Sequence, residues 1–417
     1  MSTGATGLDA ALVRVDPQAI ARDTSALVRV PSVTGDEREA LELLAAMARR
    51  LGLRADLHQH DLQALRVDAG HPGEEAPRTE LWGLAVTLGA TVAGAPRLAI
   101  DGHVDVVPPG TAAWTDGDPW SGAVRDGFVH GRGSVDMKGA VVASLHALAA
   151  AGDLAHGEVV LLGVGSEEDG GLGTLAALAR DARFDACLIP EPTGFDVVCA
   201  QAGALTFEGE VGGVAAHAAH RLEGVSAIDR YLPVHAALAT HERRLNEGVE
   251  HELMAALELP YPLLVGRLEA GEWASSVPDR LRFAGRAPVR VGEDVAAARR
   301  GVERAVAEAV RDGGPPVALA WTGGQFASGE TPAGAPFAVL ARSAVTAELG
   351  REARVAGVPW GADLRLWTAR GVPCVMAGPS GIERAHAVDE CVAIGDLAAT
   401  ARIIVRVIAG MAPGEGG

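Results

Sequence analysis

Several histidines and carboxylates in this sequence come directly after short apolar runs. His103 and Asp105 follow the run at residues 97–101. Residues two apart at the end of a strand point to the same side, and strand ends in open α/β sheets are where ligands collect. An imidazole there can bind a metal ion, while a neighbouring carboxylate fixes its tautomer. Taken alone, the pair would favour a capping aspartate beside a partly buried histidine, but it does not stand alone.

An aspartate and three adjacent acidic residues extend this pattern. Asp136 lies in a glycine-rich turn before an apolar, alanine-rich helix, where its two oxygens can reach two metal ions. Glu167, Glu168 and Asp169 follow the apolar strand predicted at 159–164. Adjacent carboxylates repel one another, which is costly unless cations compensate them. A solvated acidic loop is the alternative for this segment.

Glu191 and His386 complete the set of side chains at predicted strand ends. Glu191 follows the strand predicted at 186–189, and His386 follows the one at 372–376 after a turn with Gly and Pro. Carboxylate and imidazole groups suit zinc. The four cysteines lie far apart without a CxxC pair, so zinc held by thiolates is not expected. The sequence therefore predicts a metal site made of His and carboxylates.

The composition narrows the classes of partner. The chain has 417 residues, enough for two cores, and 48% of them are hydrophobic. Its formal net charge of -18 argues against nucleic acid and anionic membranes as partners, because phosphate binding needs clustered Lys and Arg. We expect no signal peptide and no membrane span. Four reduced thiols and the absence of these signals lead us to expect a cytoplasmic protein.

The predicted elements follow one pattern in the N-terminal and C-terminal parts of the chain and a different pattern between them. Strands and helices alternate before residue 203 and again near the C-terminus, which favours a mixed sheet with helices on both faces. Residues 60–80 predict a loop of about twenty residues. Between residue 203 and the C-terminal part of the chain, the predicted elements follow the order β-α-β-β-α, which is typical of a small sandwich with one open sheet face. We expect an α/β catalytic domain at 1–203 and 319–417, interrupted by a smaller ferredoxin-like α+β domain at 204–318.

The motifs and their order resemble the zinc metallopeptidase family of acetylornithine deacetylase, succinyl-diaminopimelate desuccinylase, aminoacylases and glutamate carboxypeptidase. The resemblance spans nearly the whole chain. It is carried by GHVDVVPPG at 102–110, GRGSVDMKG at 131–139, SEEDGG at 166–171, PEPT at 190–193 and AHAVDE at 385–390. Two family patterns differ here: Asp-x-Arg in a lid strand reads Gly285-Arg286-Ala287, and Gly-Thr-Asp reads Gly361-Ala362-Asp363.

This resemblance implies two zinc ions, which cobalt or manganese can replace. The implied ligands are His103, Asp136, Glu168, Glu191 and His386. Asp136 would bridge the ions, with His103 and Glu191 on one of them and Glu168 and His386 on the other.

The resemblance also implies roles beyond the ligands. Asp105 would orient His103, and Glu167 would be the general base. The inserted domain would be a lid that forms a homodimer, in which His217 of the sequence Gly213-Val-Ala-Ala-His217 would reach the partner's site and stabilise the oxyanion. Four arginines are candidates to bind a substrate carboxylate, three on charge alone and Arg286 from its place in the lid: Arg280, Arg286, Arg290 and Arg365.

The implied activity is removal of an N-acyl group from a small amino-acid-like substrate, as in acetylornithine deacetylase. A metallo-dipeptidase or carboxypeptidase is the alternative within the enzymes. A metal-binding paralogue without catalysis is the alternative outside them.

Overall fold

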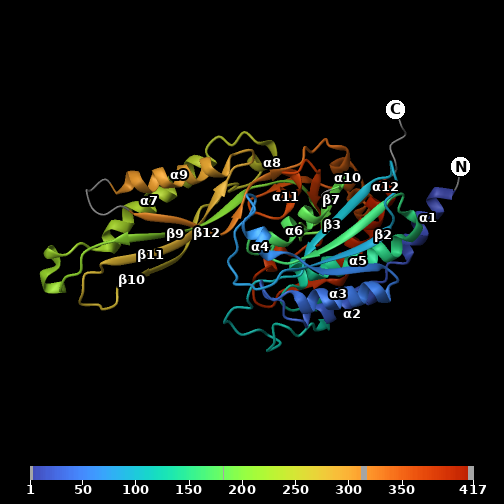
Figure 1. Ribbon diagram of the computed structural model, residues 1–417, viewed down its shortest axis with the longest axis horizontal. Helices are drawn as coiled ribbons and strands as arrows, with labels where there is room; N and C mark the ends of the chain where they lie inside the picture. Colours follow the sequence, from blue (N-terminus) through green and yellow to red (C-terminus); the bar gives the residue numbers. More distant parts are fainter. Residues whose placement is uncertain (1–2, 182, 311–316, 412–417) are drawn as a thin grey trace.

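A nine-stranded mixed sheet forms the centre of the larger of two lobes (Figure 1). The computed structural model describes residues 3–181, 183–310 and 317–411. The path of hydrogen-bonded strands across this sheet is β1 (Arg54–Gln59), β2 (Trp82–Gly89), β6 (Glu158–Val164), β3 (Arg97–His103), β7 (Ala186–Ile189), β15 (Cys374–Met376), β8 (Val197–Gln201) and β13 (Gly329–Glu330), with β14 (Val355–Val358) paired to β8. A separate small sheet contains β16 (Cys391–Ala393), β5 (Phe128–His130) and β4 (Val124–Arg125).

Helices cover both faces of the large sheet, as the alternating pattern predicted. β3 and β6 are parallel neighbours that are buried along almost their whole length, and strands covered on both faces need apolar runs of this kind. One face carries α2 (Pro17–Val28), α3 (Arg38–Arg50), α5 (Gly139–Ala151) and α12 (Ile394–Gly410), with α1 (Thr3–Val13) and α10 (Pro336–Leu349) against α12. The other face carries α6 (Leu172–Arg180) and α11 (Leu364–Thr368), which reach β3 through Thr174 and Trp367. The α/β class of the larger lobe is therefore confirmed.

The smaller lobe is a four-stranded antiparallel sheet with two long helices on one face (Figure 1). Its strands lie in the order β10 (Leu264–Ala270), β11 (Arg280–Val289), β9 (Gly203–Gly212) and β12 (Ala318–Phe326). The helices are α7 (Ala227–Asn246) and α9 (Val295–Ala309), and the short α8 (Glu252–Ala255) leads back toward β14. Numbered from β9, the strand order is two, three, one, four, which is the ferredoxin-like arrangement. Alternate residues of β9 are buried, as expected for a sheet with one covered face.

Two details differ from the sequence-based expectations. The segment predicted as a loop at 60–80 contains the short helix α4 (Leu62–Arg66), which begins because the Asp61 carboxylate accepts the backbone N–H of Ala64. The predicted domain boundary at residue 318 falls at the start of β12, so that strand continues the smaller sheet to Phe326. Within the described part of the chain, no helix has the length and apolar run needed to cross a membrane.

A buried guanidinium fastens three segments of the larger lobe together. The Arg78 side chain is fully buried, and it lies 3.2 Å from Glu37 at the start of α3 and 3.2 Å from Asp169 in the loop after β6. Glu74 lies 3.6 Å from its Nε atom. Asp169 belongs to the acidic segment that carries Glu167 and Glu168. Arg78 therefore holds this segment in place from outside the predicted site.

Replacing Arg78 with Met should destabilise the protein by about 3–5 kcal/mol, because two buried carboxylates lose their counter-charge. Denaturant unfolding at neutral pH measures the change. The matched control is Arg183→Met, since Arg183 forms a 3.2 Å pair with Asp181 at the surface and should contribute less than about 1 kcal/mol. Equal stability of the two variants would show that Arg78 does not hold these segments.

Candidate active site

Four neighbouring parallel strands of the large sheet end at the same edge, and most of the predicted site residues lie at or just after these strand ends. β6, β3, β7 and β15 are consecutive and mutually parallel. His103 is the last residue of β3, Glu167 and Glu168 follow β6, and Glu191 follows β7. His386 arrives by a longer path after β15, through a turn at Ile382–Arg384. Residues far apart in the sequence therefore meet at one edge of the sheet.

The Asp136 carboxylate lies between two histidines. Its Oδ1 atom is 3.1 Å from Nε2 of His103, and its Oδ2 atom is 3.4 Å from Nε2 of His386. Each oxygen thus faces a different imidazole, which is the arrangement that a bridging carboxylate needs.

Each histidine also has a second carboxylate beside it. Glu191 Oε1 lies 3.7 Å from Nε2 of His103, and Glu168 Oε2 lies 3.2 Å from Nε2 of His386. One ligand atom each of His103, Asp136 and Glu168 lies within 4.8 Å of the others. Imidazole and carboxylate donors in two groups around a shared aspartate suit two divalent ions such as zinc. The residues present therefore fit the pair of metals that the resemblance implies.

Asp105 contacts both His103 and the acidic loop, by which we mean the loop after β6 that carries Glu167, Glu168 and Asp169. The Nδ1–H of His103 donates to the backbone carbonyl of Asp105 at 2.9 Å, whereas the Asp105 carboxylate lies 3.6 Å away. This hydrogen bond leaves Nε2 of His103 free to bind a metal ion. The carboxylate accepts the backbone N–H groups of Glu167 and Glu168, each at 3.2 Å. Asp105 therefore orients His103 mainly through its backbone, and its side chain positions the loop.

Glu390 is a site residue whose role the sequence did not reveal, although it belongs to the AHAVDE motif. Its buried carboxylate accepts the backbone N–H groups of Val135 at 3.0 Å and Asp136 at 3.2 Å. Arg132 donates to the same carboxylate at 2.6 Å. Arg132 and Glu390 therefore fix the turn that presents Asp136. A buried Arg paired with a buried Glu about 260 residues away leaves no local pattern in a single sequence.

Crowding of charge raises the pKa of several groups in this site. Burial lowers the pKa of His103, but the hydrogen bond to Asp136 and the nearby Glu191 raise it well above its ordinary value. Hydrogen bonds to Asp136 and Glu168 raise the pKa of His386 to about 10. Burial, and next the charge of Asp136, raise the pKa of Glu191 to about 8. The metal-free site therefore keeps protons that offset the repulsion between its carboxylates.

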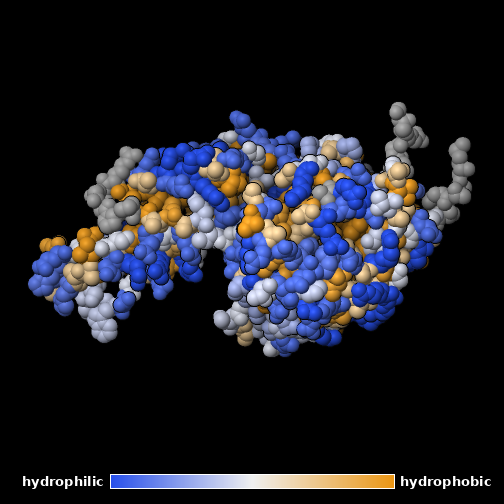
Figure 2. Space-filling view, viewed as in Figure 1, coloured by the Kyte–Doolittle hydropathy of each residue, from blue (hydrophilic) through white to orange (hydrophobic). Residues whose placement is uncertain are grey.

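Glu167 faces a cavity of about 680 Å³ that opens where the two lobes meet. The molecule narrows at this junction (Figure 2). Asp136, Glu168 and His386 line the same cavity, and Phe326 and Arg286 close it from the smaller lobe. Burial raises the pKa of Glu167 well above its ordinary value, and the nearby Asp363 raises it further. A buried carboxyl group beside a metal site can accept a proton from one reacting group and donate it to another.

The candidate arginines separate into one inside the cavity and three outside it. Arg286 lines the cavity. Arg365 is buried, and its guanidinium donates to the backbone carbonyls of Ala362 and Gly170 while it lies over Phe326. We therefore correct its predicted role in substrate binding, because its donors serve the backbone behind the cavity wall. Arg280 lies beside Glu269 and Glu272 on the smaller lobe, and Arg290 pairs with Glu293.

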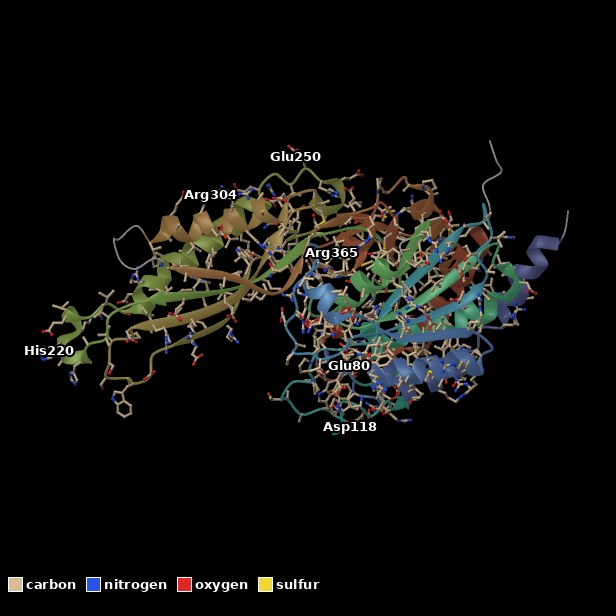
Figure 3. All side chains as sticks on the ribbon, in the orientation of Figure 1. Glu80, Asp118, His220, Glu250, Arg304 and Arg365 are labelled. Carbon is tan, nitrogen blue, oxygen red and sulfur yellow. The ribbon has the colours of Figure 1, made fainter. Side chains whose placement is uncertain are left out.

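His217 lies far from the cavity and the predicted metal ligands of its own chain. It precedes the turn Ala218–Glu223 and packs 6.5 Å from His220, measured between ring centroids. Figure 3 places His220 at the far end of the smaller lobe and Arg365 near the junction of the lobes. His217 is therefore exposed at the tip of that lobe.

Sequence comparisons relate this chain to known proteins over most of its length. The sequence profile of Peptidase family M20/M25/M40 matches residues 99–410. A succinyl-diaminopimelate desuccinylase from Methylobacterium radiotolerans is 30% identical, over 96% of this chain and 98% of its own length. One of the same name from Methylorubrum populi is 32% identical, over 92% of this chain and 96% of its own length.

Solved structures share the fold at low sequence identity. A dipeptidase from Saccharomyces cerevisiae has a TM-score of 0.77 and 14% identity, covering 98% of this chain and 99% of its own. A dinuclear metal-binding peptidase of the M20 family from Bacillus subtilis has a TM-score of 0.63 and 15% identity, covering 94% of this chain and 97% of its own. At this identity the likeness concerns the fold alone.

Zinc binding to the metal-free protein should release protons, because ligands bind metals as neutral imidazoles and ionised carboxylates. The raised pKa values of His103 and His386 mean that both hold protons at neutral pH. The apparent Kd for zinc should therefore rise as the pH falls. For each proton that zinc displaces, the rise is about tenfold per pH unit. Because the buffer takes up the released protons, calorimetry in Tris and in phosphate should give different enthalpies of zinc binding. Equal enthalpies and a constant Kd between pH 8 and 6 would contradict this assignment.

Proposed function

This chain belongs to Peptidase family M20/M25/M40, and from that premise we propose that it is a two-metal amidohydrolase that removes the acyl group of an N-acylated amino acid. The observation that carries the proposal is the Asp136 carboxylate, whose two oxygens face His103 and His386 in separate directions. We propose His103 and Glu191 as further ligands of one ion and His386 and Glu168 as further ligands of the other. When bound, two divalent ions supply Lewis-acid activation of a water molecule and of the substrate carbonyl.

Glu167 is the proposed general base. Its backbone N–H is held by Asp105, and its buried carboxyl group lines the cavity beside Glu168 and Asp136. Glu167 takes a proton from the attacking water and later donates it to the leaving nitrogen, so one residue serves both halves of the reaction. The amine product can then leave as an uncharged or protonated species through the open side of the cavity.

We propose a succinyl group as the first acyl group to test. Two relatives at 30% and 32% identity are named succinyl-diaminopimelate desuccinylase, and each aligns with more than nine-tenths of this chain. Arg286 in the cavity wall carries the charge needed to bind a substrate carboxylate. Zinc is the first metal to test, and cobalt and manganese are its expected substitutes.

We also propose a homodimer in which His217 acts on the partner's substrate. The smaller lobe exposes several large hydrophobic side chains, and Figure 2 has hydrophobic surface at its far end. Leu222 is 96% exposed and Trp273 is 75% exposed, which is unusual unless another surface covers them. An exposed His217 near this surface would stabilise the oxyanion in trans. A cytoplasmic location is a further prediction, supported by the four free cysteines.

Glu167→Gln should abolish turnover while leaving metal binding intact, because the amide cannot accept the proton. We expect kcat on a succinylated amino acid to fall by about 100-fold or more. Metal content from elemental analysis serves as the control. Turnover near the wild-type rate on the best substrate would contradict the role of Glu167.

Mixing two inactive variants tests the role of His217 in trans. Glu167→Gln and His217→Ala should each be inactive alone, but a mixed dimer has one site with both residues intact. After subunits exchange at equal concentrations, we expect about a quarter of the wild-type activity. No recovery, with dimer exchange verified by native mass spectrometry, would exclude an action of His217 across the interface.

A further inference from the structure

The two histidines of the proposed metal site are held in different ways. His103 ends a buried strand, its side chain is 1% exposed, and its Nδ1–H donates to the carbonyl of Asp105. The His386 side chain is 53% exposed, and among the residues that the structure describes none accepts a hydrogen bond from its Nδ1 atom. A histidine ligand without such a partner depends on its backbone for orientation. The position of His386 is therefore set by the turn that carries it.

This turn, residues 384–390, has a backbone that needs support from other segments. His386 and Asp389 each have a φ of +60°, in the left-handed region that residues with a Cβ atom rarely adopt. The turn belongs to no strand, so no ladder of backbone hydrogen bonds fixes it. Such a conformation persists only where the surrounding contacts determine it. Contacts from elsewhere in the chain must therefore hold His386 in place.

One of these contacts reaches the turn through Arg132. Its Nη2 atom donates to the carbonyl of His386 at 3.1 Å, and its Nη1 atom donates to Glu390 at 2.6 Å. The Cζ atom of Arg132 lies 5.4 Å from the centroid of the Trp114 ring, a distance at which the ring attracts the cation. Trp114 belongs to residues 107–122, which we call the Trp114 loop. Arg132 therefore connects this loop to the backbone of a proposed metal ligand.

The next residue of the Trp114 loop contacts the turn directly. The Asp389 carboxylate accepts the backbone N–H of Thr115 on Oδ1 and the Oγ1–H of Thr115 on Oδ2, each at 2.7 Å. These hydrogen bonds lower the pKa of Asp389 below its ordinary value. Because both oxygens of an ionised carboxylate are occupied, the contact fixes its direction as well as its distance. Trp114 and Thr115 therefore support the turn at its two left-handed residues.

The Trp114 loop can support the turn because its far end is fixed to the larger lobe. The hydroxyl of Ser25 in α2 donates to the carbonyl of Gly122 at 2.5 Å. Nε of Arg29, which follows α2, donates to the carbonyl of Ser121 at 3.0 Å. The loop is thus attached at one end to the helical layer and in its middle to the turn of His386.

We propose that Thr115 is a positioning residue for the metal ion at His386 and that it acts through Asp389. Thr115 touches neither the ion nor the substrate, but it holds the turn that presents one of the two proposed metal positions. The other position, at His103 and Glu191, follows β3 and β7 and has no contact with Thr115. The Trp114 loop therefore sets the metal affinity of one position separately from that of the other. This inference rests on the proposed two-metal function.

Zinc binding to the metal-free protein, followed by calorimetry, tests the proposal. His386→Ala identifies which of the two binding steps belongs to His386. Thr115→Val removes the hydroxyl donor with little change of shape and should weaken the same step by about 10-fold, the lower end of the losses for groups that orient metal ligands. The other step should change by less than about 3-fold, as for an independent site. Thr115→Ser keeps the hydroxyl and should bind zinc like the wild type.

Asp389→Asn changes the other side of the same contact. Asparagine tolerates a left-handed backbone, but it loses the charge and has only one acceptor oxygen. It should weaken the step of His386, and adding Thr115→Val should weaken that step little further, because both variants act through one contact. The matched control is Thr111→Val, since Thr111 is exposed in the same loop and its hydroxyl makes no hydrogen bond with the described residues.

A loss confined to the step of His386, with Thr115→Ser and Thr111→Val like the wild type, supports the proposal. Two binding steps that Thr115→Val leaves unchanged, or weakens to the same extent, would overturn it and leave the two-metal site intact. The same loss in Thr111→Val would also overturn it. A wild-type chain that binds only one zinc ion would reject the proposed two-metal function and this inference with it.

Discussion

Crowding of acidic groups at the edge of the large sheet is the constraint on which the rest of the site depends. Asp105, Asp136, Glu167 and Glu191 are all buried or nearly so within a few residues of strand ends. Carboxylates this close cannot all be ionised unless cations lie between them. In the metal-free chain the two histidines supply part of that charge, and this explains why the pKa values of His103 and His386 are raised. The same groups can exchange those protons for metal ions.

Buried ion pairs outside this cluster hold it together. Arg132 and Glu390 fix the turn of Asp136, and Arg78 fixes Asp169 at the far end of the acidic loop. Arg365 binds the carbonyl of Gly170 at the end of the same loop. Three guanidinium groups therefore brace the segments that present the predicted ligands, and none of them needs to touch a substrate. Asp169 in the same loop also accepts the backbone N–H groups of Glu75 and Ala76, so the loop is connected to the segment at 68–80.

Much of this could be predicted from the sequence because the signals are local. Apolar runs followed by His, Asp or Glu predicted both the sheet and the residues at its edge, and five motifs in one order led to the family. The β-α-β-β-α order of the predicted elements also predicted the open face of the smaller sheet, and the alternate burial of β9 residues agrees with it. These features depend on neighbours within a few residues.

The rest depends on contacts between distant segments, which a single sequence does not record. Arg365 looked like a free cation, but folding directs its donors to two backbone carbonyls, and one of them, that of Gly170, is distant in the sequence. Glu75 lay in a segment predicted only as a loop, yet the fold brings it into the wall of the cavity, 3.6 Å from Arg286 of the smaller lobe. The trans role proposed for His217 depends on contacts with a second copy of the chain.

The bridging role of Asp136 is the central claim, and anomalous diffraction from a zinc-soaked crystal tests it most directly. We predict two zinc peaks about 3.5–4 Å apart, one beside Oδ1 of Asp136 toward His103 and the other beside Oδ2 toward His386. A single peak, or two peaks of which neither contacts Asp136, would contradict the account.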